Sequence, residues 1–137
     1  LISRPDITFS VSVLSRYLDK PTVQLWKAGK RILRYLSTTK NHGLQFTKGI
    51  SGLVGMCDAD WGGDKQSRKS VSGFVGLCAG NVIAWHSRKQ NCVALSSMEA
   101  EYVSAGVAAQ ELVNLKGILS EFGESSPILL KIDNLSA

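Results

Sequence analysis

Hydrophobic residues recur at helical spacing in the first third of the chain and at strand spacing after residue 50. Residues 6–18 fit both periods. Side chains from Ile7 onward alternate between hydrophobic and polar, as in a strand, whereas Ile7, Val11 and Leu14 lie at helical spacing. Periodicity alone leaves both structures open, and the helix is favoured because Asp6 is an acceptable N-cap.

Residues 22–37 predict an amphipathic helix with a cationic outer face. Thr22 follows a proline and can cap the first turn. A hydrophobic stripe runs from Leu25 to Leu36, and basic residues lie opposite it. No acidic residue accompanies these cations, which either form a solvated surface or bind a polyanion such as a nucleic-acid backbone. The cations are Lys27, Lys30, Arg31 and Arg34.

After residue 50 the hydrophobic residues form short runs that predict β-strands. The first of these strands is followed by Asp58. Gly80 and Asn81 are a tight-turn signal, so the strands on either side of them should form a hairpin. A polar loop is expected at residues 88–91. The three predicted strands cover residues 53–57, 71–78 and 82–85.

A long helix is predicted from Ser96 to about Phe122. Ser96 and Glu99 fit a capping box, in which the serine caps the helix and the glutamate reaches back to it. Gly123 is a typical C-terminal stop. Residues 128–132 form one more hydrophobic run. Strands in hairpin order, a long helix and a further strand predict an α/β protein (an α+β mixed sheet) with the helix on one face.

Charge divides the chain into two parts. The 137 residues suffice for one domain with a core but not for two full ones. The net charge of +5 conceals nine basic and two acidic residues at positions 1–50, against seven basic and nine acidic residues at positions 51–137. With glycines at 49 and 52, this predicts a basic helical segment at 1–50 and a second domain at 51–137. A polyanion-binding flank beside a carboxylate site is typical of such a division.

The cysteines and the hydropathy of the chain indicate in which cellular compartment the protein is expected. Three dispersed cysteines argue against a disulfide framework and a zinc knuckle, and favour a reducing environment. No run approaches the roughly 18 apolar residues of a membrane span, and the first residues lack the apolar stretch of a signal peptide. We therefore expect an intracellular protein, not secreted and without a membrane partner. Because it starts at Leu1 and stops just after a strand, we expect a piece of a longer chain.

Three acids stand out by position. Asp58 ends the first predicted strand, Asp133 ends the last, and Glu101 lies in the first turn of the long helix. Glu101 shares that helix's hydrophobic stripe, where an isolated carboxylate is costly, whereas Glu99 lies on another face and is left to capping. Magnesium bound to the three acids would satisfy Glu101, and paired metals can hydrolyse a phosphodiester. The alternative is that each acid is an ordinary strand-end or helix-start residue.

Four motifs follow one another along the second part of the chain: CDADWGGD (57–64), RKSVSGF (68–74), IAWHSRKQ (83–90) and VALSSMEAEY (93–102). Together they closely resemble the ribonuclease H region of copia-type retrotransposon Pol polyproteins. Residues 133–137 look like that family's next motif. Residues 3–7 and 30–36 are similar to the stretch that links the reverse transcriptase to the nuclease, so the resemblance spans nearly the whole chain.

The resemblance implies a ribonuclease-H-like fold: a mixed sheet whose first three strands are antiparallel, flanked by helices. It also implies magnesium-dependent hydrolysis of the RNA strand of RNA–DNA hybrids during reverse transcription, with Mn²⁺ as a possible substitute and no small-molecule cofactor. The implied partners are the hybrid and the rest of the polyprotein, including its reverse transcriptase. By motif, Asp58 matches the first catalytic aspartate, Glu101 the helix glutamate and Asp133 the third acid. All three would bind metal, and Asp60 is a lesser candidate.

Contacts to a hybrid duplex are expected to be electrostatic and to follow its shape. His86 is expected to be a strand-end surface residue, and Trp61 and Trp85 to pack in a turn and in the core. Besides the four helix cations, the expected nucleic-acid contacts are Arg88, Lys89, Gln90 and Asn134.

The chain departs from the family pattern in ways that leave alternatives open. The family's fourth metal-binding acid, later helix and fifth strand would lie beyond residue 137, although residues 134–137 would open a further helix. The fold is therefore expected to be incomplete at its C-terminus. One alternative is a truncated, inactive retroelement remnant that at most binds nucleic acid. Another is a basic adaptor, which leaves the inward Glu101 unexplained. The family implies a cytoplasmic virus-like particle or the nucleus as location.

Overall fold

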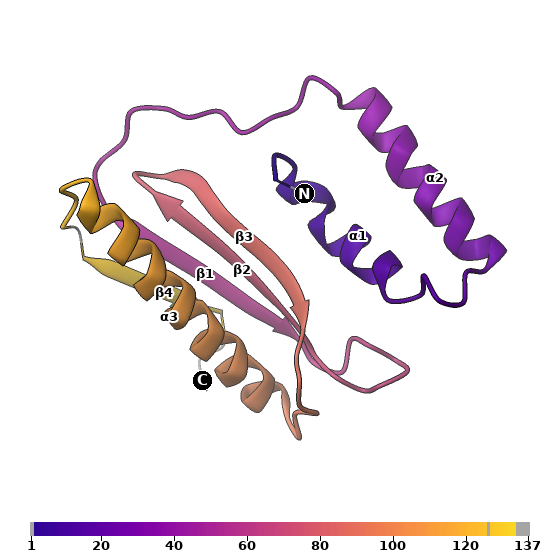
Figure 1. Ribbon diagram of the computed structural model, residues 1–137. Coiled ribbons are helices and arrows are strands. Elements are labelled where there is room, and N and C mark those ends of the chain that lie inside the picture. Colours follow the sequence, from indigo (N-terminus) through magenta and orange to yellow (C-terminus); the bar gives the residue numbers. More distant parts are fainter. Residues whose placement is uncertain (1, 126, 134–137) are drawn as a thin grey trace. The chain divides into compact units, whose positions relative to one another are not determined.

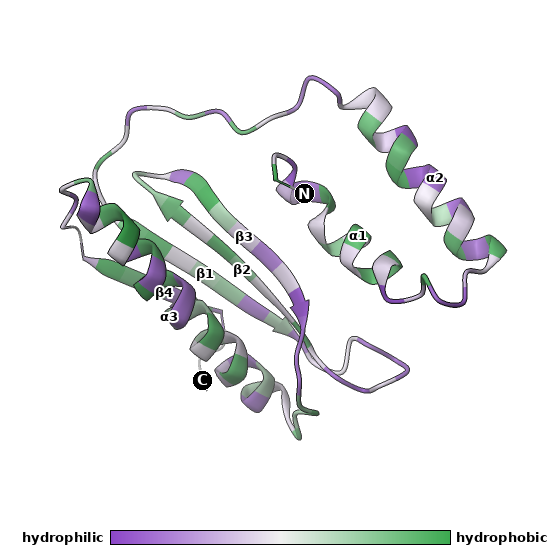
Figure 2. Cartoon of the chain, viewed as in Figure 1, coloured by the Kyte–Doolittle hydropathy of each residue, from purple (hydrophilic) through white to green (hydrophobic). Residues whose placement is uncertain are grey.

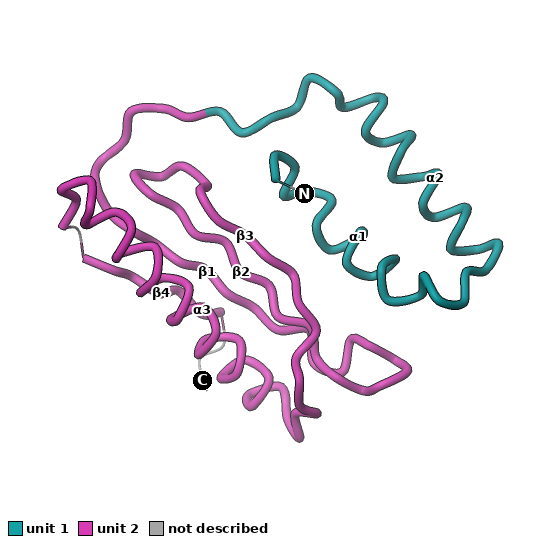
Figure 3. Tube along the Cα trace, in the orientation of Figure 1, with its two compact units in different colours: residues 1–45 teal, residues 46–137 magenta. Residues whose placement is uncertain are grey.

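The computed structural model describes residues 2–125 and 127–133, and the chain divides into two compact units, Leu1–Gln45 and Phe46–Ala137 (Figure 3). The division predicted between residues 50 and 51 therefore lies inside the second unit. The first unit contains the 3-10 helix η1 (Pro5–Ile7) and the helices α1 (Thr8–Ser15) and α2 (Val23–Thr38). The second contains β1 (Leu53–Asp60), β2 (Val71–Cys78), β3 (Asn81–Lys89), α3 (Ser97–Glu121) and β4 (Ile128–Ile132).

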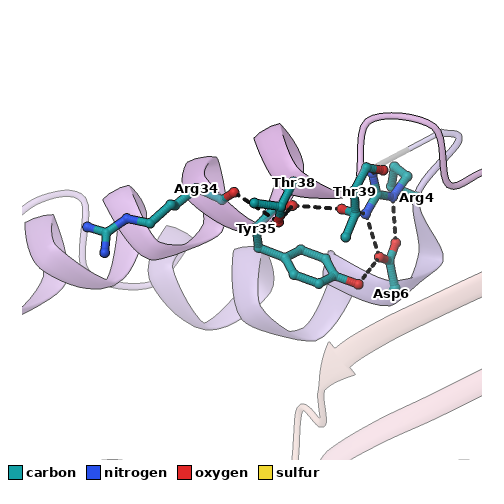
Figure 4. A network of polar contacts seen from close by, with 6 residues as sticks. All are labelled: Arg4, Asp6, Arg34, Tyr35, Thr38 and Thr39. Carbon is teal, nitrogen blue, oxygen red and sulfur yellow. Dashed lines mark hydrogen bonds and ion pairs between the residues drawn. The ribbon is translucent and has the colours of Figure 1, made fainter.

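The ambiguous segment at the start of the chain is helical, as predicted. The predicted N-cap is wrong, because Asp6 lies within η1 and makes no cap. Its carboxylate instead accepts hydrogen bonds from Arg4 (2.9 and 2.7 Å) and from the Tyr35 hydroxyl (2.7 Å). Arg4 also donates to the Thr39 carbonyl at 3.0 Å. This network, shown in Figure 4, ties the start of the chain to the C-terminal end of α2.

Helix α2 begins where the sequence predicts. The Thr22 hydroxyl accepts a hydrogen bond from the Leu25 N–H at 3.3 Å, which satisfies one of the donors left free in the first helical turn. The hydrophobic stripe from Leu25 to Leu36 is half-buried and α2 packs against α1. Hydrophobic and hydrophilic residues alternate along α2 in Figure 2, as expected of an amphipathic helix.

The second unit is a four-stranded mixed sheet in the order β3-β2-β1-β4 with α3 on one face (Figure 1). Strands β1, β2 and β3 pair antiparallel in sequence, and β4 pairs parallel with β1. Helix α3 packs on β1, β2 and β4. This architecture confirms the predicted mixed α/β class.

Two predicted strands are longer than their hydrophobic runs indicate. Strand β1 continues through Asp58 to Asp60, because the ladder with β2 extends to the pair Asp60–Val71. Strand β3 continues to Lys89, so the loop predicted at 88–91 is wrong for residues 88 and 89. Pairing with a neighbouring strand keeps polar residues extended where hydrophobicity gives no signal.

The β2–β3 turn lies one residue earlier than predicted. Ala79 and Gly80 both adopt left-handed backbone conformations (φ 49° and 79°), and Asn81 already opens β3. Positive φ at both central residues is the signature of a type I′ turn, whose twist matches that of the flanking strands.

Helix α3 is capped nearly as predicted. The Ser96 hydroxyl accepts from the Glu99 N–H at 3.1 Å, but the Glu99 carboxylate reaches the Leu95 N–H at 2.6 Å rather than Ser96 itself. The helix ends at Glu121, and Gly123 follows in a left-handed conformation (φ 82°). No helix in the described part of the chain is long and apolar enough to cross a membrane.

The core of the second unit lies between α3 and the sheet. Leu112 is 1% exposed and lies over Gly55 of β1, where an added Cβ would come within 2.6 Å of a Leu112 methyl group. The cysteines at 57, 78 and 92 are all free. The buried members of this core are Leu53, Cys57, Phe74, Ala105, Ala108 and Leu112.

Candidate active site

Asp58 and Asp133 lie at the same end of two neighbouring parallel strands. The register of β1 against β4 ends at the pair Cys57–Ile132, and the next residues along the two strands are these aspartates. Both are exposed. The sequence-based placement of the two acids at strand ends therefore puts them side by side, although β1 itself runs on to Asp60.

Glu101 is directed inward, as its place on the hydrophobic stripe predicts, and is 7% exposed. Its Oε1 accepts a hydrogen bond from the Ala59 N–H at 3.3 Å. One helical turn later, the Ser104 hydroxyl donates to the Asp58 carbonyl at 2.9 Å. The Asp58 carbonyl and the Ala59 N–H belong to one peptide unit, so α3 binds both polar groups of that unit. Helix α3 thereby fixes the backbone from which the Asp58 side chain projects.

The second carboxylate oxygen of Glu101 has no hydrogen-bond partner among the described residues, although it is buried. Burial raises the pKa of the Glu101 carboxyl, and the neighbouring charges of Asp58 and Asp133 raise it further. The hydrogen bond from Ala59 acts in the opposite direction. A buried, unpaired oxygen beside other carboxylates is a position where positive charge would be stabilising.

The donor set fits a hard divalent cation, but the protein does not gather a closed cage for one. Within residues 2–125 and 127–133, no three His, Cys, Asp or Glu side chains are placed to hold a metal ion. Magnesium, however, is commonly bound by one or two carboxylates and completes its shell with water and phosphate oxygens. Asp58 and Glu101 are neighbouring carboxylates, and Oε2 of Glu101 is buried without a hydrogen-bond partner among the described residues.

Asp60, the lesser candidate, belongs to the same strand end. Because side chains alternate along a strand, Asp58 and Asp60 project from the same face of β1. The Asp60 carboxylate lies against Gly63, where any added Cβ would overlap it. Glycine at position 63 leaves room for this carboxylate in the turn that follows β1.

The two basic residues near the end of β3 differ in how strongly they are paired with acidic side chains. Lys89 binds the buried Asp64 carboxylate at 2.6 Å, and Ser67 donates to the same oxygen at 2.9 Å. The Lys89 ammonium, followed by the Ser67 hydroxyl, holds the pKa of Asp64 well below its usual range. Arg88 is 67% exposed and makes only a long ion pair with Glu111 (3.6 Å). Arg88 is therefore the more available of the two for a phosphate.

Gln90 is buried and links the end of β3 to the start of α3. Its amide donates to the Ser72 hydroxyl at 2.9 Å and to the Ala100 carbonyl at 2.8 Å. The structure thus uses Gln90 to place the helix turn that carries Glu101. Asn134 lies outside the described residues, and the four basic residues of α2 belong to the other unit.

The expectations for His86 and Trp61 have opposite outcomes. A surface position for His86 at a strand end is wrong, since this residue lies within β3 and stacks on Phe74 with ring centroids 5.3 Å apart. Burial lowers the pKa of His86, and Arg88 adds to this effect. Trp61 lies in the turn after β1, as predicted, and its indole N–H donates to the Ala94 carbonyl at 3.0 Å, but the residue is 52% exposed rather than fully packed.

Sequence reasoning missed Ser104 and Asp64. Ser104 lies three residues after Glu101, so helical spacing puts it on the same face, which was the available signal. Asp64 sits in a polar turn, and nothing in its sequence context marks it as buried.

Several known proteins are similar to this chain. Secreted RxLR effector protein 161 of Plasmopara viticola is 46% identical over 114 residues, which cover 82% of this chain and 80% of that protein. The retrovirus-related Pol polyprotein from transposon TNT 1-94 of Nicotiana tabacum is 44% identical over 121 residues, 88% of this chain. That from transposon RE2 of Arabidopsis thaliana is 39% identical over 138 aligned residues, 98% of this chain.

The match covers only 9% and 10% of the two Pol polyproteins, so the chain corresponds to about a tenth of their length. No protein-family model matches the chain. No solved structure matches it either.

Proposed function

The chain belongs to the Pol polyproteins of copia-type retrotransposons, and on this premise we propose that it hydrolyses the RNA strand of RNA–DNA hybrids. One observation carries the proposal. Helix α3 binds both polar groups of the peptide unit that joins Asp58 to Ala59, and it does so with Glu101 and Ser104. The contact leaves one buried oxygen of Glu101 open beside the Asp58 carboxylate.

Asp58 and Glu101 would hold a divalent cation, magnesium or in its place manganese, and Asp133 would complete the acidic edge. When bound, such a cation lowers the pKa of water and stabilises a leaving oxygen of a phosphodiester. The side chains of this protein have a positioning role. Ser104 and Ala59 fix the backbone at Asp58 and one oxygen of Glu101, so the acids are ordered before substrate arrives. Exposed Asp58 and Asp133 leave the edge open to a duplex.

The proposed substrate contacts follow the charges on the surface. Arg88 of β3 would bind a backbone phosphate, since its guanidinium is largely exposed. Lys89 and Gln90 would act indirectly, because one is paired with Asp64 and the other is buried under α3. The basic residues of α2 would add attraction for the hybrid that depends on salt concentration. We propose that hydrolysis accompanies reverse transcription within a longer polyprotein.

Cleavage of a hybrid tests this function directly. The chain is incubated with an RNA–DNA hybrid labelled on the RNA strand, with and without magnesium. We expect magnesium-dependent cleavage of the RNA strand alone. Asp58→Asn should abolish it, whereas Asp19→Asn, the same substitution at an exposed position of the first unit, should cleave like the wild type. Equal cleavage by Asp58→Asn and wild type would contradict the proposal.

A second candidate function is nucleic-acid binding without hydrolysis. It is favoured by one observation, the four basic residues of α2 with no acidic residue on that helix. This alternative predicts that the chain binds the hybrid and leaves it intact at every magnesium concentration. The same assay, read for both binding and cleavage, separates the two functions.

A further inference from the structure

Helix α2 exposes hydrophobic side chains on the face that points away from α1. Val23, Trp26 and Leu33 are 68%, 66% and 66% exposed, although two of the three are large apolar residues that are usually covered. With about 100° between successive residues, Trp26, Lys30 and Leu33 share one line along the helix. We call this surface the α2 outer face, and it consists of Val23, Trp26, Lys27, Lys30, Leu33 and Arg34.

The charged and aromatic groups of the α2 outer face are already arranged together. The Lys30 ammonium lies 5.7 Å from the centre of the Trp26 ring, within the range of a cation–π interaction. Lys27 and Arg34 flank this pair along the helix, and both are exposed. None of the residues of α2 is acidic, so no carboxylate on the helix neutralises the patch.

The cations and the aromatic ring of the α2 outer face complement the phosphates and bases of a nucleic acid. Phosphates of a nucleic-acid backbone match the uncompensated cations. The aromatic ring adds a flat apolar surface, which an unpaired base can stack on. The bases of a duplex already stack on one another, so a duplex would use the cations and leave the ring exposed. The ring next to the cations therefore favours a single strand over a duplex.

We propose that the α2 outer face binds single-stranded nucleic acid, with a base stacked on Trp26 and phosphates bound by Lys27, Lys30 and Arg34. This extends the nucleic-acid binding in the proposed function to a substrate class that the acidic site does not require. It places the single-strand contact in the first unit and the hydrolytic site in the second.

The test uses the whole chain and a fluorescein-labelled dT12 oligonucleotide, with binding followed by anisotropy in the absence of divalent ions. Trp26→Leu keeps an apolar side chain of good helix propensity and removes the ring. It should weaken dT12 binding roughly five- to a hundredfold, with little effect on a 12-base-pair duplex. Lys30→Gln should lower the dependence of log K on log salt by about 0.7, the value for one phosphate contact of a single strand. Lys65→Gln, the same change at an exposed position of the second unit, should lower it less.

Circular dichroism establishes that each variant keeps its helices, and Trp26→Phe, which retains an aromatic ring, should recover most of the affinity. If Trp26→Leu bound dT12 with wild-type affinity, the proposal would be overturned. The α2 outer face would then be a candidate for an apolar contact with a protein instead. Equal losses for dT12 and the duplex would overturn the proposal too. Because no metal is present and dT12 is not cleaved, these outcomes are independent of whether the chain hydrolyses a hybrid.

Discussion

Glu101 Oε1 accepts a hydrogen bond from the backbone N–H of Ala59 at 3.3 Å, so the N-terminal part of α3 is bonded to β1 directly after Asp58. The carbonyl of the same peptide unit accepts the Ser104 hydroxyl at 2.9 Å. Two residues one helical turn apart thus hold a single peptide unit. The relationship between Asp58 and Glu101 is therefore set by contacts to the backbone at Asp58, which a change in the Asp58 side chain can leave intact.

Removing the charge of Glu101 should change the pH dependence of stability. Burial raises the pKa of Glu101 in the folded chain, so the folded state holds this proton more tightly than the unfolded state. That contribution is fully present below the ordinary glutamate pKa and is lost as pH rises through the raised value. Above the ordinary glutamate pKa of about 4.3, the melting temperature of metal-free wild type should therefore gain less with rising pH than that of Glu101→Gln.

The matched control for this prediction is Glu121→Gln, at the exposed C-terminal end of the same helix. It should keep the wild-type pH profile. The profiles are measured by thermal melting in the presence of a chelator. Parallel profiles for wild type and Glu101→Gln would show that ionisation of Glu101 does not destabilise the folded state.

Adding a side chain at Gly55 should strongly destabilise the packing between β1 and α3. An alanine Cβ there would lie 2.6 Å from one Leu112 methyl group, and Leu112 is too buried to move aside easily. Gly55→Ala should cost about 1–3 kcal/mol of unfolding free energy, and Leu112→Ala about 2–5 kcal/mol. In the double variant the overlap is gone, so the combined cost should be less than the sum of the two. Urea denaturation measures all three, and strict additivity would contradict direct packing of Leu112 on Gly55.

Gln90 should behave as a structural residue. Gln90→Met removes two hydrogen bonds and leaves the Ser72 hydroxyl and the Ala100 carbonyl without these donors. The expected loss of unfolding free energy is about 1–3 kcal/mol. Arg88→Gln, two residues earlier and largely exposed, should change stability little and should weaken hybrid binding instead. If Gln90→Met weakens hybrid binding at unchanged stability, Gln90 contacts the nucleic acid directly.

Much of this fold is predictable because it rests on local signals. The cap at Thr22, the start of α3 at Ser96 and its stop before Gly123 follow from residue type and spacing. Glu101 could be chosen over Glu99 by helical geometry alone, and it is buried while Glu99 caps. These features need no knowledge of distant contacts.

The features that the sequence did not predict depend on partners far along the chain. Asp60 and Lys89 stay in strands because they pair across the sheet with Val71, which hydrophobicity does not reveal. Gln90 lies in a polar run yet is buried, because Ala100 offers its carbonyl to the side chain. Asp6 fails as a helix cap because Arg4 and Tyr35 compete for its carboxylate.

The central claim, that Asp58 and Glu101 bind a divalent cation, is tested most directly by measuring Mn²⁺ binding to the chain. Electron paramagnetic resonance measures this binding as the loss of the free-ion signal, and Mg²⁺ should compete for the same site. The wild type should bind Mn²⁺, and both Asp58→Asn and Glu101→Gln should weaken binding by about tenfold or more. Asp19→Asn and Glu121→Gln should bind as the wild type does. Binding that is unchanged in Glu101→Gln would contradict the claim that its open oxygen is a metal ligand.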